Sequence, residues 1–246
     1  MIVDGKKIAG QIAARLQPQP GTTLGILVFP DDRAGQTYSR IKQAAAEKLG
    51  IKVLISEDFQ VLDNWAKDPA ITGILIQYPG WRGENFYQQW QTLVAKIPAA
   101  KDVDGLREDS PFTPATVKAV ERILQYMKLK HGRIKNSYII VGRGMVGKAL
   151  AKKLTAENIS SADPLLTQKI LQADVVISAC GKPKIIKSVK PGAIVIDCGW
   201  PAAEADFTAI KDVATALTPV PGGVGPITVA CLLENLVQAG YNQKIL

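Results

Sequence analysis

The stretch that decides the fold of the second half of the chain is Ile139-Ile140-Val141-Gly142-Arg143-Gly144-Met145-Val146-Gly147. An apolar run typical of a β-strand leads into a Gly-x-Gly-x-x-Gly turn, and residues 148–156 follow it with a helical pattern. In this setting the glycines allow a tight turn and a close approach of backbone to a pyrophosphate, which the helix N-terminus stabilises. We therefore expect a dinucleotide site, and a turn without a ligand is the alternative. Its residues would be Gly142, Arg143, Gly144, Val146 and Gly147.

The acidic residue expected about 20 positions further on is Asp163. At the end of the second strand of such a unit, a carboxylate binds the ribose hydroxyls of the adenosine and repels a 2′-phosphate. No arginine lies between Gly144 and Leu166 to hold that phosphate, so the sequence by itself favours NAD over NADP. The alternative is that Asp163 only starts a turn before Pro164.

Short apolar runs and amphipathic stretches alternate along the chain. Strands are expected at residues 24–29, 52–55, 71–77, 138–141, 159–162, 175–179 and 193–197. Helices are expected at residues 6–16, 34–49, 61–66, 84–94, 114–129, 148–156 and 227–239. Strands that alternate with helices form parallel sheets covered by helices. The sequence therefore predicts an α/β protein, in which the helix at 114–129 connects one α/β unit to a second, Rossmann-type doubly wound unit.

Length and charge narrow the possible classes of protein. The 246 residues allow one to two domains, and 47% hydrophobic with 21% charged residues exclude a disordered chain. Thirty Lys and Arg residues against 22 Asp and Glu residues leave a net charge of +8, which suits an anionic partner. The basic residues are scattered and no reading motif is present, so we expect small anions rather than nucleic acid.

Metal and membrane chemistry have little support in the sequence. Cys180, Cys198 and Cys231 lie far apart without ligand spacing, and His131, the single histidine, is expected in a surface loop. A zinc cluster or a Ser-His-Asp triad lacks the ligands it needs, so no metal is expected. No run of about 18 apolar residues occurs and charges stand near the N-terminus, so we expect no membrane span and a cytoplasmic protein.

Several polar side chains fall where an α/β protein places its site. Tyr38 and Lys42 are four residues apart, on one face of a predicted helix. Partial burial would lower the pKa of that lysine and free a neutral amine for proton transfer. Gln77 ends an apolar strand, and Asp102 and Asp104 lie on one side of an extended segment. Taken singly, such residues are more often solvated charges or turn caps.

Longer motifs occur in the order known from one enzyme family. They are Val3-Asp4-Gly5-Lys6, Tyr38 with Lys42, Gly73-Ile74-Leu75-Ile76-Gln77-Tyr78-Pro79, Lys101-Asp102-Val103-Asp104-Gly105-Leu106, Thr113-Pro114, Gly142-Arg143, Gly181-Lys182-Pro183, Pro191-Gly192-Ala193-Ile194-Val195-Ile196-Asp197 and Thr218-Pro219-Val220-Pro221-Gly222-Gly223-Val224-Gly225-Pro226-Ile227-Thr228-Val229-Ala230. On these residues the chain resembles, nearly end to end, the bifunctional methylenetetrahydrofolate dehydrogenase/methenyltetrahydrofolate cyclohydrolases, the FolD family.

The resemblance implies two domains and two reactions. A catalytic, folate-binding domain at residues 1–118 would receive a C-terminal helix at 226–246, and a Rossmann NAD(P)-binding domain would occupy 119–225. The expected reactions are oxidation of 5,10-methylenetetrahydrofolate and hydrolysis of the methenyl product to 10-formyltetrahydrofolate. The family's usual assembly is a homodimer paired through the cofactor domains.

The resemblance also implies roles for single residues. Lys42 would be the central catalytic residue, assisted by Gln77, Tyr38 and Asp102. Substrate-binding residues would be Tyr38, Asp102, Asp104, Pro221, Gly222, Gly223 and Thr228. The cofactor would contact Gly142, Arg143, Gly144, Val146, Gly147, Asp163, Gly181 and Trp200, with Gly142 to Gly144 at the pyrophosphate and Trp200 near the nicotinamide.

The chain departs from the family pattern at positions that determine the preference for NAD or NADP. Gly142-Arg143-Gly144 replaces the usual Gly-Arg-Ser, the Cys-His-Ser segment that helps grip a 2′-phosphate is missing, and the stretch 201–207 is trimmed. The family implies NADP, whereas Asp163 and the shortened loop allow NAD. Two alternatives stay open: a member that kept only cyclohydrolase activity, and a non-catalytic basic module that binds nucleic acid.

Overall fold

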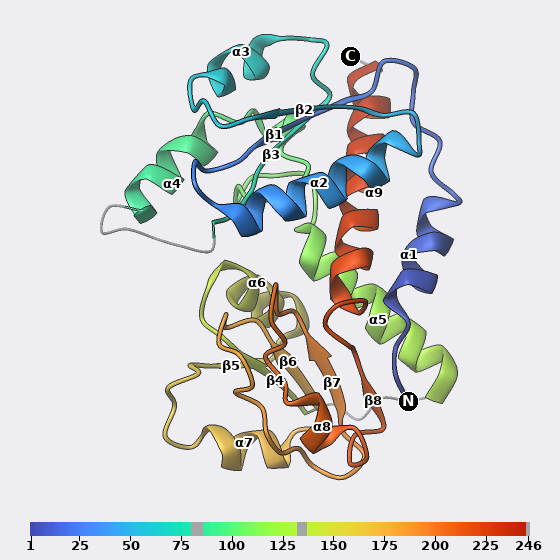
Figure 1. Ribbon diagram of the computed structural model, residues 1–246, viewed down its shortest axis with the longest axis vertical. Coiled ribbons are helices and arrows are strands. Elements are labelled where there is room, and N and C mark those ends of the chain that lie inside the picture. The colour runs from blue at the N-terminus through green and yellow to red at the C-terminus, as the bar shows by residue number, and fades with distance from the viewer. Residues whose placement is uncertain (80–85, 132–136, 245–246) are drawn as a thin grey trace. The chain divides into compact units, whose positions relative to one another are not determined.

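The computed structural model describes residues 1–79, 86–131 and 137–244 (Figure 1). The chain divides into two compact units. The five-stranded unit, as we call it, consists of Met1–Gly10 and Thr116–Thr228, and the three-stranded unit consists of Gln11–Ala115 and Val229–Leu246. All strand pairs within both sheets are parallel, which confirms the predicted α/β fold.

The three-stranded sheet has the order β2-β1-β3. Its strands are β1 (Thr23–Leu27), β2 (Lys52–Ser56) and β3 (Gly73–Ile76). Every residue of β1 and β3 is buried, because helices cover both faces of this sheet. Side chains alternate between the faces: Leu24 and Ile26 join one core cluster, whereas Leu27 joins the other. Gly25 points toward the second cluster, where the indole ring of Trp65 fills the space that a side chain would need.

Four helices contribute further residues to the core of the three-stranded unit. They are α2 (Arg33–Glu47), α3 (Val61–Lys67), α4 (Phe86–Ala95) and the larger part of α9 (Val224–Lys244). One cluster contains Ala46 of α2 with Leu232 and Leu236 of α9, and the other contains Trp65 of α3 with Trp90 of α4. The last helix of the chain therefore shares a core with the strands near its beginning.

The five-stranded sheet has the order β5-β4-β6-β7-β8. Its strands are β4 (Tyr138–Val141), β5 (Glu157–Ile159), β6 (Val175–Ser178), β7 (Ile194–Asp197) and β8 (Ala216–Leu217). The helices of this unit are α5 (Ala115–His131, from Thr116), α6 (Met145–Leu154), α7 (Leu166–Gln172) and α8 (Phe207–Ile210). The strand order reverses between β4 and β6, as it does at the ligand-binding crevice of doubly wound sheets.

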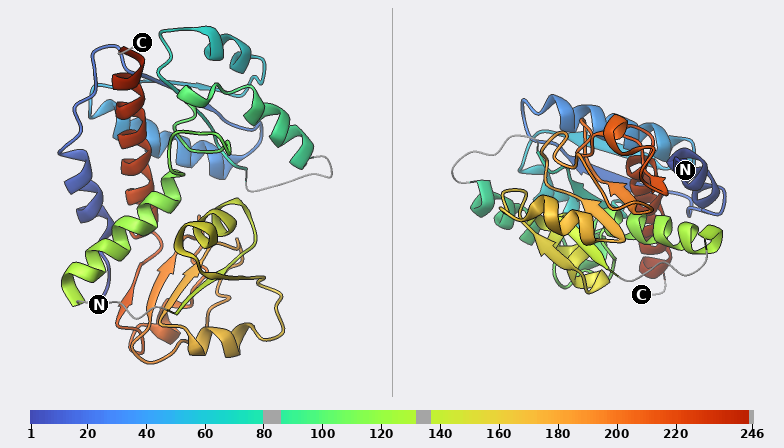
Figure 2. Two further views of the ribbon diagram at one scale, coloured as in Figure 1. Left: turned by 180° about the vertical axis from the view of Figure 1, so that it is seen from behind. Right: turned by 90° about the horizontal axis from the view of Figure 1, so that it is seen from below.

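The amino-terminal segment belongs to the five-stranded unit. Ile2 forms a parallel bridge with Leu217 of β8, and the Val3 N–H donates to the Leu217 carbonyl at 3.0 Å. Helix α1 (Gly5–Ala13) follows directly. Figures 1 and 2 show the N-terminus beside β8, so the first residues of the chain lie at the edge of a sheet built from its second half.

Some predicted element boundaries are wrong. The strand expected at 159–162 is β5 at Glu157–Ile159, because the Ser160 hydroxyl and the Asp163 carboxylate accept N–H bonds from residues two positions on and turn the chain. The helix expected to end at 129 runs to His131, so this residue is helical rather than in a loop. The helix expected at 84–94 is observed at Phe86–Ala95, and residues 84 and 85 of this expectation lie outside the described residues. Within the described part of the chain, no helix has the length and apolar character that a bilayer crossing requires.

Candidate active site

Lys42 forms the centre of a polar cluster in the three-stranded unit. It lies on α2 with 4% of its surface exposed, and its Nζ donates to Gln77 Oε1 at 2.7 Å. The same Nζ lies 4.7 Å from the centre of the Tyr38 ring, one helical turn earlier. Gln77 follows β3 directly, and its backbone N–H bonds to the Leu27 carbonyl at 2.8 Å. The structure thus brings together three residues that the sequence placed on a helix face and at a strand end.

The charge of Lys42 depends on burial and on Asp104. Burial lowers the pKa of Lys42 from 10.5 to about 8, and the negative charge of Asp104 opposes this shift. Burial also raises the pKa of Asp104 to about 6, where the Lys42 charge lowers it and Asp102 raises it. An amine with a pKa near 8 supplies both its protonated and its neutral form close to neutral pH, which suits a group that gives and takes protons.

Asp102 has a different environment from Asp104. Its side chain is fully buried, and its two carboxylate oxygens accept the backbone N–H groups of Leu106 at 3.0 Å and Arg107 at 2.8 Å. Burial raises the pKa of Asp102, and these hydrogen bonds oppose the rise. The carboxylate therefore shapes the turn that presents Asp104, and its direct part in the chemistry stays a prediction.

Two further residues fix the segment that carries these carboxylates. Lys101 Nζ donates to the carbonyls of Trp65, Ala66 and Asp68 at the end of α3, at 3.0, 3.1 and 2.7 Å. Asn235 of α9 is 2% exposed, and its amide donates to the carbonyls of Val103 at 2.9 Å and Thr113 at 3.0 Å. The sequence analysis missed Asn235, although one amide inside the apolar pattern of the last helix is a signal for a buried hydrogen bond.

The three glycines of the turn after β4 have three different surroundings. Gly142 has φ of 124°, and a Cβ there would lie 2.2 Å from the Ala179 carbonyl oxygen. A Cβ on Gly147 would lie 1.8 Å from the Gly142 oxygen, so this position requires glycine for the contact between helix and strand. A Cβ on Gly144, the N-cap of α6, would meet no atom within 4 Å. The open space in front of a helix N-terminus fits a pyrophosphate.

The other predicted residues of this turn lie around it. Arg143 is exposed, and its Nε donates to the Asn158 carbonyl at 3.3 Å. The Asn158 side chain in turn donates to the Gly142 carbonyl at 2.8 Å, which holds β5 to the turn. Val146 is partly buried in the first turn of α6.

Asp163 lies four residues beyond the end of β5. Its carboxylate accepts the Leu165 N–H at 2.8 Å and a bond from Lys169 Nζ at 3.2 Å, and both bonds lower its pKa. Lys169 also pairs with Glu157 at 2.9 Å. The turn that we considered as the alternative is therefore present, and the role of Asp163 in cofactor choice stays a prediction.

Two buried carboxylates hold the loops after β6 and β7. Glu204, 2% exposed, accepts the N–H groups of Cys180 at 2.9 Å and Gly181 at 2.7 Å. Asp197, 1% exposed, accepts those of Gly199 and Ala205, each at 2.8 Å. Burial raises the pKa of Asp197, the hydrogen bonds from Ala205 and Gly199 oppose this rise, and the negative charge of Glu204 adds to it. The sequence analysis missed Glu204, because its partners lie more than 20 positions away.

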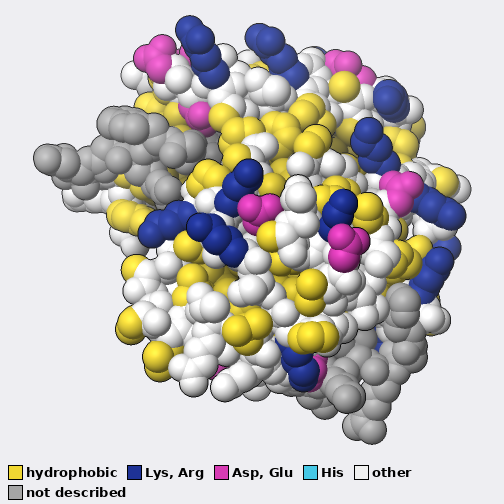
Figure 3. All heavy atoms as spheres, turned by 60° about the horizontal axis from the view of Figure 1, so that its bottom comes forward, with side chains coloured by type: hydrophobic (Ala, Val, Ile, Leu, Met, Phe, Trp, Pro, Cys, Tyr) yellow, Lys and Arg dark blue, Asp and Glu magenta, His cyan; other side chains and the backbone are white. Residues whose placement is uncertain are grey.

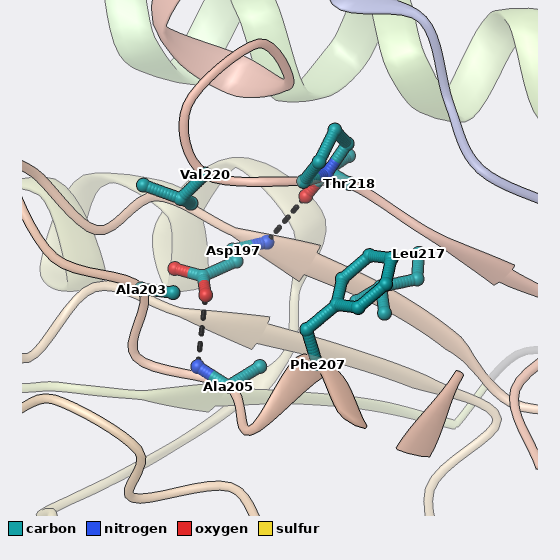
Figure 4. Close-up of a pocket in the computed structure, with 8 residues that line it drawn as sticks. Asp197, Ala203, Ala205, Phe207, Leu217, Thr218 and Val220 are labelled. Atoms are coloured by element: carbon teal, nitrogen blue, oxygen red, sulfur yellow. Dashed lines mark hydrogen bonds between the residues drawn. The ribbon is translucent and has the colours of Figure 1, made fainter. Parts of the chain in front are cut away.

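A cavity of about 240 Å³ opens beside Asp197 in the five-stranded unit (Figure 4). It is lined by Asp197, Ala203, Ala205, Phe207, Leu217, Thr218, Pro219 and Val220. The Thr218 hydroxyl accepts the Asp197 N–H at 2.7 Å, which joins β7 to the segment after β8. The wall is mostly apolar, as is usual for pockets that take a flat organic ring.

The remaining predicted residues also belong to the five-stranded unit. Gly181 has φ of 71°, and Trp200 is 39% exposed beyond the end of β7. Gly222 has φ of 107°, and the Gly223 N–H bonds to the Pro219 carbonyl at 2.8 Å. Thr228, on α9, donates its hydroxyl to the Val224 carbonyl at 3.2 Å. Among the described side chains, no group of three or more His, Cys, Asp or Glu residues could hold a metal ion.

Comparison with known proteins identifies both parts of the chain. Residues 3–104 match the family model of the tetrahydrofolate dehydrogenase/cyclohydrolase catalytic domain, and residues 114–244 match that of its NAD(P)-binding domain. The bifunctional protein FolD of Vesicomyosocius okutanii is 32% identical over 280 aligned positions, which cover 99% of each chain. The alignment is longer than the 246 residues of this chain, so this relative has segments that the chain lacks.

Solved structures give the same result. The bifunctional 5,10-methylenetetrahydrofolate dehydrogenase/cyclohydrolase of Thermoplasma acidophilum is 30% identical with a TM-score of 0.82, and the match covers 100% of both chains. A 5,10-methylenetetrahydrofolate dehydrogenase from the silkworm Bombyx mori is 28% identical with a TM-score of 0.86, over 100% of this chain and 99% of that one. The resemblance read from the sequence is thereby confirmed, and the chain belongs to the tetrahydrofolate dehydrogenase/cyclohydrolase (FolD) family.

Proposed function

We propose that the protein is a bifunctional one-carbon folate enzyme. It oxidises 5,10-methylenetetrahydrofolate with NAD(P) to the 5,10-methenyl form and hydrolyses this product to 10-formyltetrahydrofolate. The observation that carries the proposal is the buried Lys42, bonded to Gln77 at 2.7 Å with a pKa of about 8. A lysine in this state is available both as an acid and as a base near neutral pH, whereas a solvated surface lysine is almost fully protonated there and cannot act as a base.

Lys42 takes up and returns a proton during hydrolysis of the methenyl group. Water attacks this carbon, and the neutral amine of Lys42 takes the proton that the water loses. The ammonium then returns this proton to N5 as the bond between this nitrogen and the carbon breaks, and the new hydroxyl group releases its own proton to water as the formyl carbonyl forms. Gln77 accepts a hydrogen bond from Lys42 Nζ and so keeps the amine in place through both transfers. Tyr38, whose ring lies beside the same Nζ, contacts the folate.

The five-stranded unit supplies the cofactor site. A bound NAD(P) would supply the acceptor for the hydride that leaves the methylene carbon. The open face of Gly144 and the N-terminus of α6 would hold the pyrophosphate, and Gly142 and Gly147 provide the tight turn that leads into this helix. Arg143 and Val146 flank this turn, Gly181 presents backbone after β6, and Trp200 would contact the nicotinamide side of the cofactor.

Replacing Asp104 with asparagine is expected to move the pH dependence of hydrolysis. Asp104 raises the pKa of Lys42, so without its charge this pKa falls below about 8. The rate then reaches its plateau at lower pH, with a midpoint shifted by roughly one unit. The pH profile of methenyltetrahydrofolate hydrolysis, corrected for the uncatalysed rate, measures this shift. Asp104→Glu keeps the charge and serves as the control, and an unmoved midpoint in Asp104→Asn would contradict the coupling.

A dehydrogenase assay with methylenetetrahydrofolate and either NAD or NADP tests the whole proposal. We expect reduced nicotinamide to form with a lower KM for NAD than for NADP, because Asp163 repels a 2′-phosphate. Asp163→Asn removes this repulsion and is expected to narrow the ratio of the two KM values. Turnover with NADP alone would refute the role of Asp163. If neither NAD nor NADP supports turnover while methenyltetrahydrofolate is still hydrolysed, the protein is the family member that kept only cyclohydrolase activity.

The nucleic-acid-binding alternative has less support. On the face drawn in Figure 3, Lys and Arg side chains are dispersed among acidic and apolar ones and do not form a continuous stripe.

Family membership favours a cytoplasmic homodimer paired through the cofactor domains. The molar mass of the protein in solution, measured by light scattering, tests the dimer directly.

A further inference from the structure

Residues 1–3 are anchored on β8, and the chain then reaches the loop Pro221-Gly222-Gly223. The Leu217 N–H donates to the Met1 carbonyl at 3.0 Å, and the Val3 N–H donates to the Leu217 carbonyl at the same distance. The Val3 side chain is 1% exposed. The segment therefore enters the five-stranded unit as an additional edge of its sheet, and Gly5 follows at a fixed place.

Gly5 contacts the loop at Pro221-Gly222-Gly223 through backbone alone. Its N–H donates to the Gly222 carbonyl at 3.0 Å. A Cβ on Gly5 would lie 1.9 Å from the Gly223 oxygen and 2.6 Å from the Gly222 oxygen. Both atoms are backbone, so no flexible side chain can move aside to admit a methyl group.

Gly223 within the loop is equally confined by the residues that precede the loop. A Cβ on Gly223 would lie 2.5 Å from the Pro219 oxygen and 2.7 Å from the Thr218 Cβ. Thr218 is itself held, because its hydroxyl accepts the Asp197 N–H at 2.7 Å. The loop is thus held in place by Gly5 and by the segment Thr218-Pro219 that follows β8.

We infer that Gly5 is a positioning residue for the substrate: its N–H and its missing side chain set the place of the Pro221-Gly222-Gly223 loop and thereby the affinity for the folate. This inference rests on the proposed function and on the folate contact that the resemblance to the FolD family implies for this loop. A loop displaced by about 1 Å loses contacts that depend on alignment. The loss falls on binding, because Lys42 and Gln77 belong to other elements.

The test compares Gly5→Ala with Gly10→Ala on the same helix. A Cβ on Gly10 would meet no atom within 4 Å, so this control adds the same methyl group without a clash. For Gly5→Ala we expect the KM for methenyltetrahydrofolate to rise roughly tenfold or more, while kcat stays within about threefold of wild type. Gly10→Ala keeps the wild-type values. Equal KM values in the two variants, or a fall in kcat alone, would overturn the inference.

Two further measurements cover the case in which Gly5→Ala does not fold or the wild type shows no turnover. Val3→Ala loosens the anchor on β8 without a clash and is expected to raise the same KM by a smaller factor; an unchanged KM would overturn the inference. Amide hydrogen exchange over residues 218–224 needs no activity. Faster exchange of the Gly223 N–H in Val3→Ala than in Gly10→Ala supports the positioning, and equal exchange refutes it. Absent turnover in the wild type would refute the proposed function alone.

Discussion

Replacing Lys42 with methionine is expected to lower the kcat for methenyltetrahydrofolate hydrolysis by about 10³-fold while the protein still folds. The change removes the group that takes and returns protons, and Gln77 loses the donor that it binds at 2.7 Å. Methionine has a similar length and no charge to desolvate at a site that is 4% exposed, so the free energy of unfolding should change by no more than about 1.5 kcal/mol. The decay of methenyl absorbance and a denaturant titration measure the two effects.

Lys48→Met is the matched control for this variant. Lys48 is the exposed C-cap of the same helix α2, and its loss should leave kcat at the wild-type value. A Lys42→Met enzyme with more than a tenth of wild-type kcat would exclude Lys42 as the acid and base. The denaturant titration accompanies the assay because it shows whether a loss of activity comes from catalysis or from unfolding.

Replacing Gly147 with alanine is expected to have the largest effect on stability. The new Cβ would lie 1.8 Å from the Gly142 carbonyl oxygen, so either α6 or the turn after β4 must shift. Asn158 bonds to the same carbonyl at 2.8 Å, and this bond is lost if the turn moves. We expect the free energy of unfolding to fall by about 3 kcal/mol or more. Urea denaturation of both proteins measures it.

Gly144→Ala separates cofactor binding from stability in the same motif. The added methyl group meets no protein atom within 4 Å, so the free energy of unfolding should change by no more than about 1 kcal/mol, the cost of alanine at an N-cap. The methyl group projects into the space assigned to the pyrophosphate, and the KM for NAD(P) should rise. Equal stability of the Gly144→Ala and Gly147→Ala proteins would refute the different roles given to these glycines.

Local spacing was sufficient to predict part of the site. Tyr38 and Lys42 meet because residues four apart share a helix face, which needs no knowledge of the rest of the fold. The glycine turn follows from a strand, three glycines and a helix in succession. The approach of Gln77 to Lys42 is a weaker inference of the same kind, since strand ends in parallel sheets lie where ligands bind.

Rules of local spacing do not predict side chains that form hydrogen bonds with backbone groups far away in the sequence. Glu204 reaches Cys180, and Asn235 reaches Val103, which lies 132 positions away. Asp102 and Asp163 were read as candidates for ligand contact, whereas their carboxylates also accept N–H bonds within their own turns. Sequence separation hides the first kind of bond, and the second kind is shared by functional and purely structural turns.

The interleaving of the two units has a consequence for synthesis on the ribosome. The chain emerges from its N-terminus, yet the first ten residues pack with residues 116–228, and the last eighteen complete the core around β1. The five-stranded unit has all of its parts only when residue 228 has been made, and the three-stranded unit only when α9 has been made as well. Apolar core residues of the nascent chain therefore stay exposed for nearly the whole of its elongation. A chaperone that binds apolar segments would have access to them during this period.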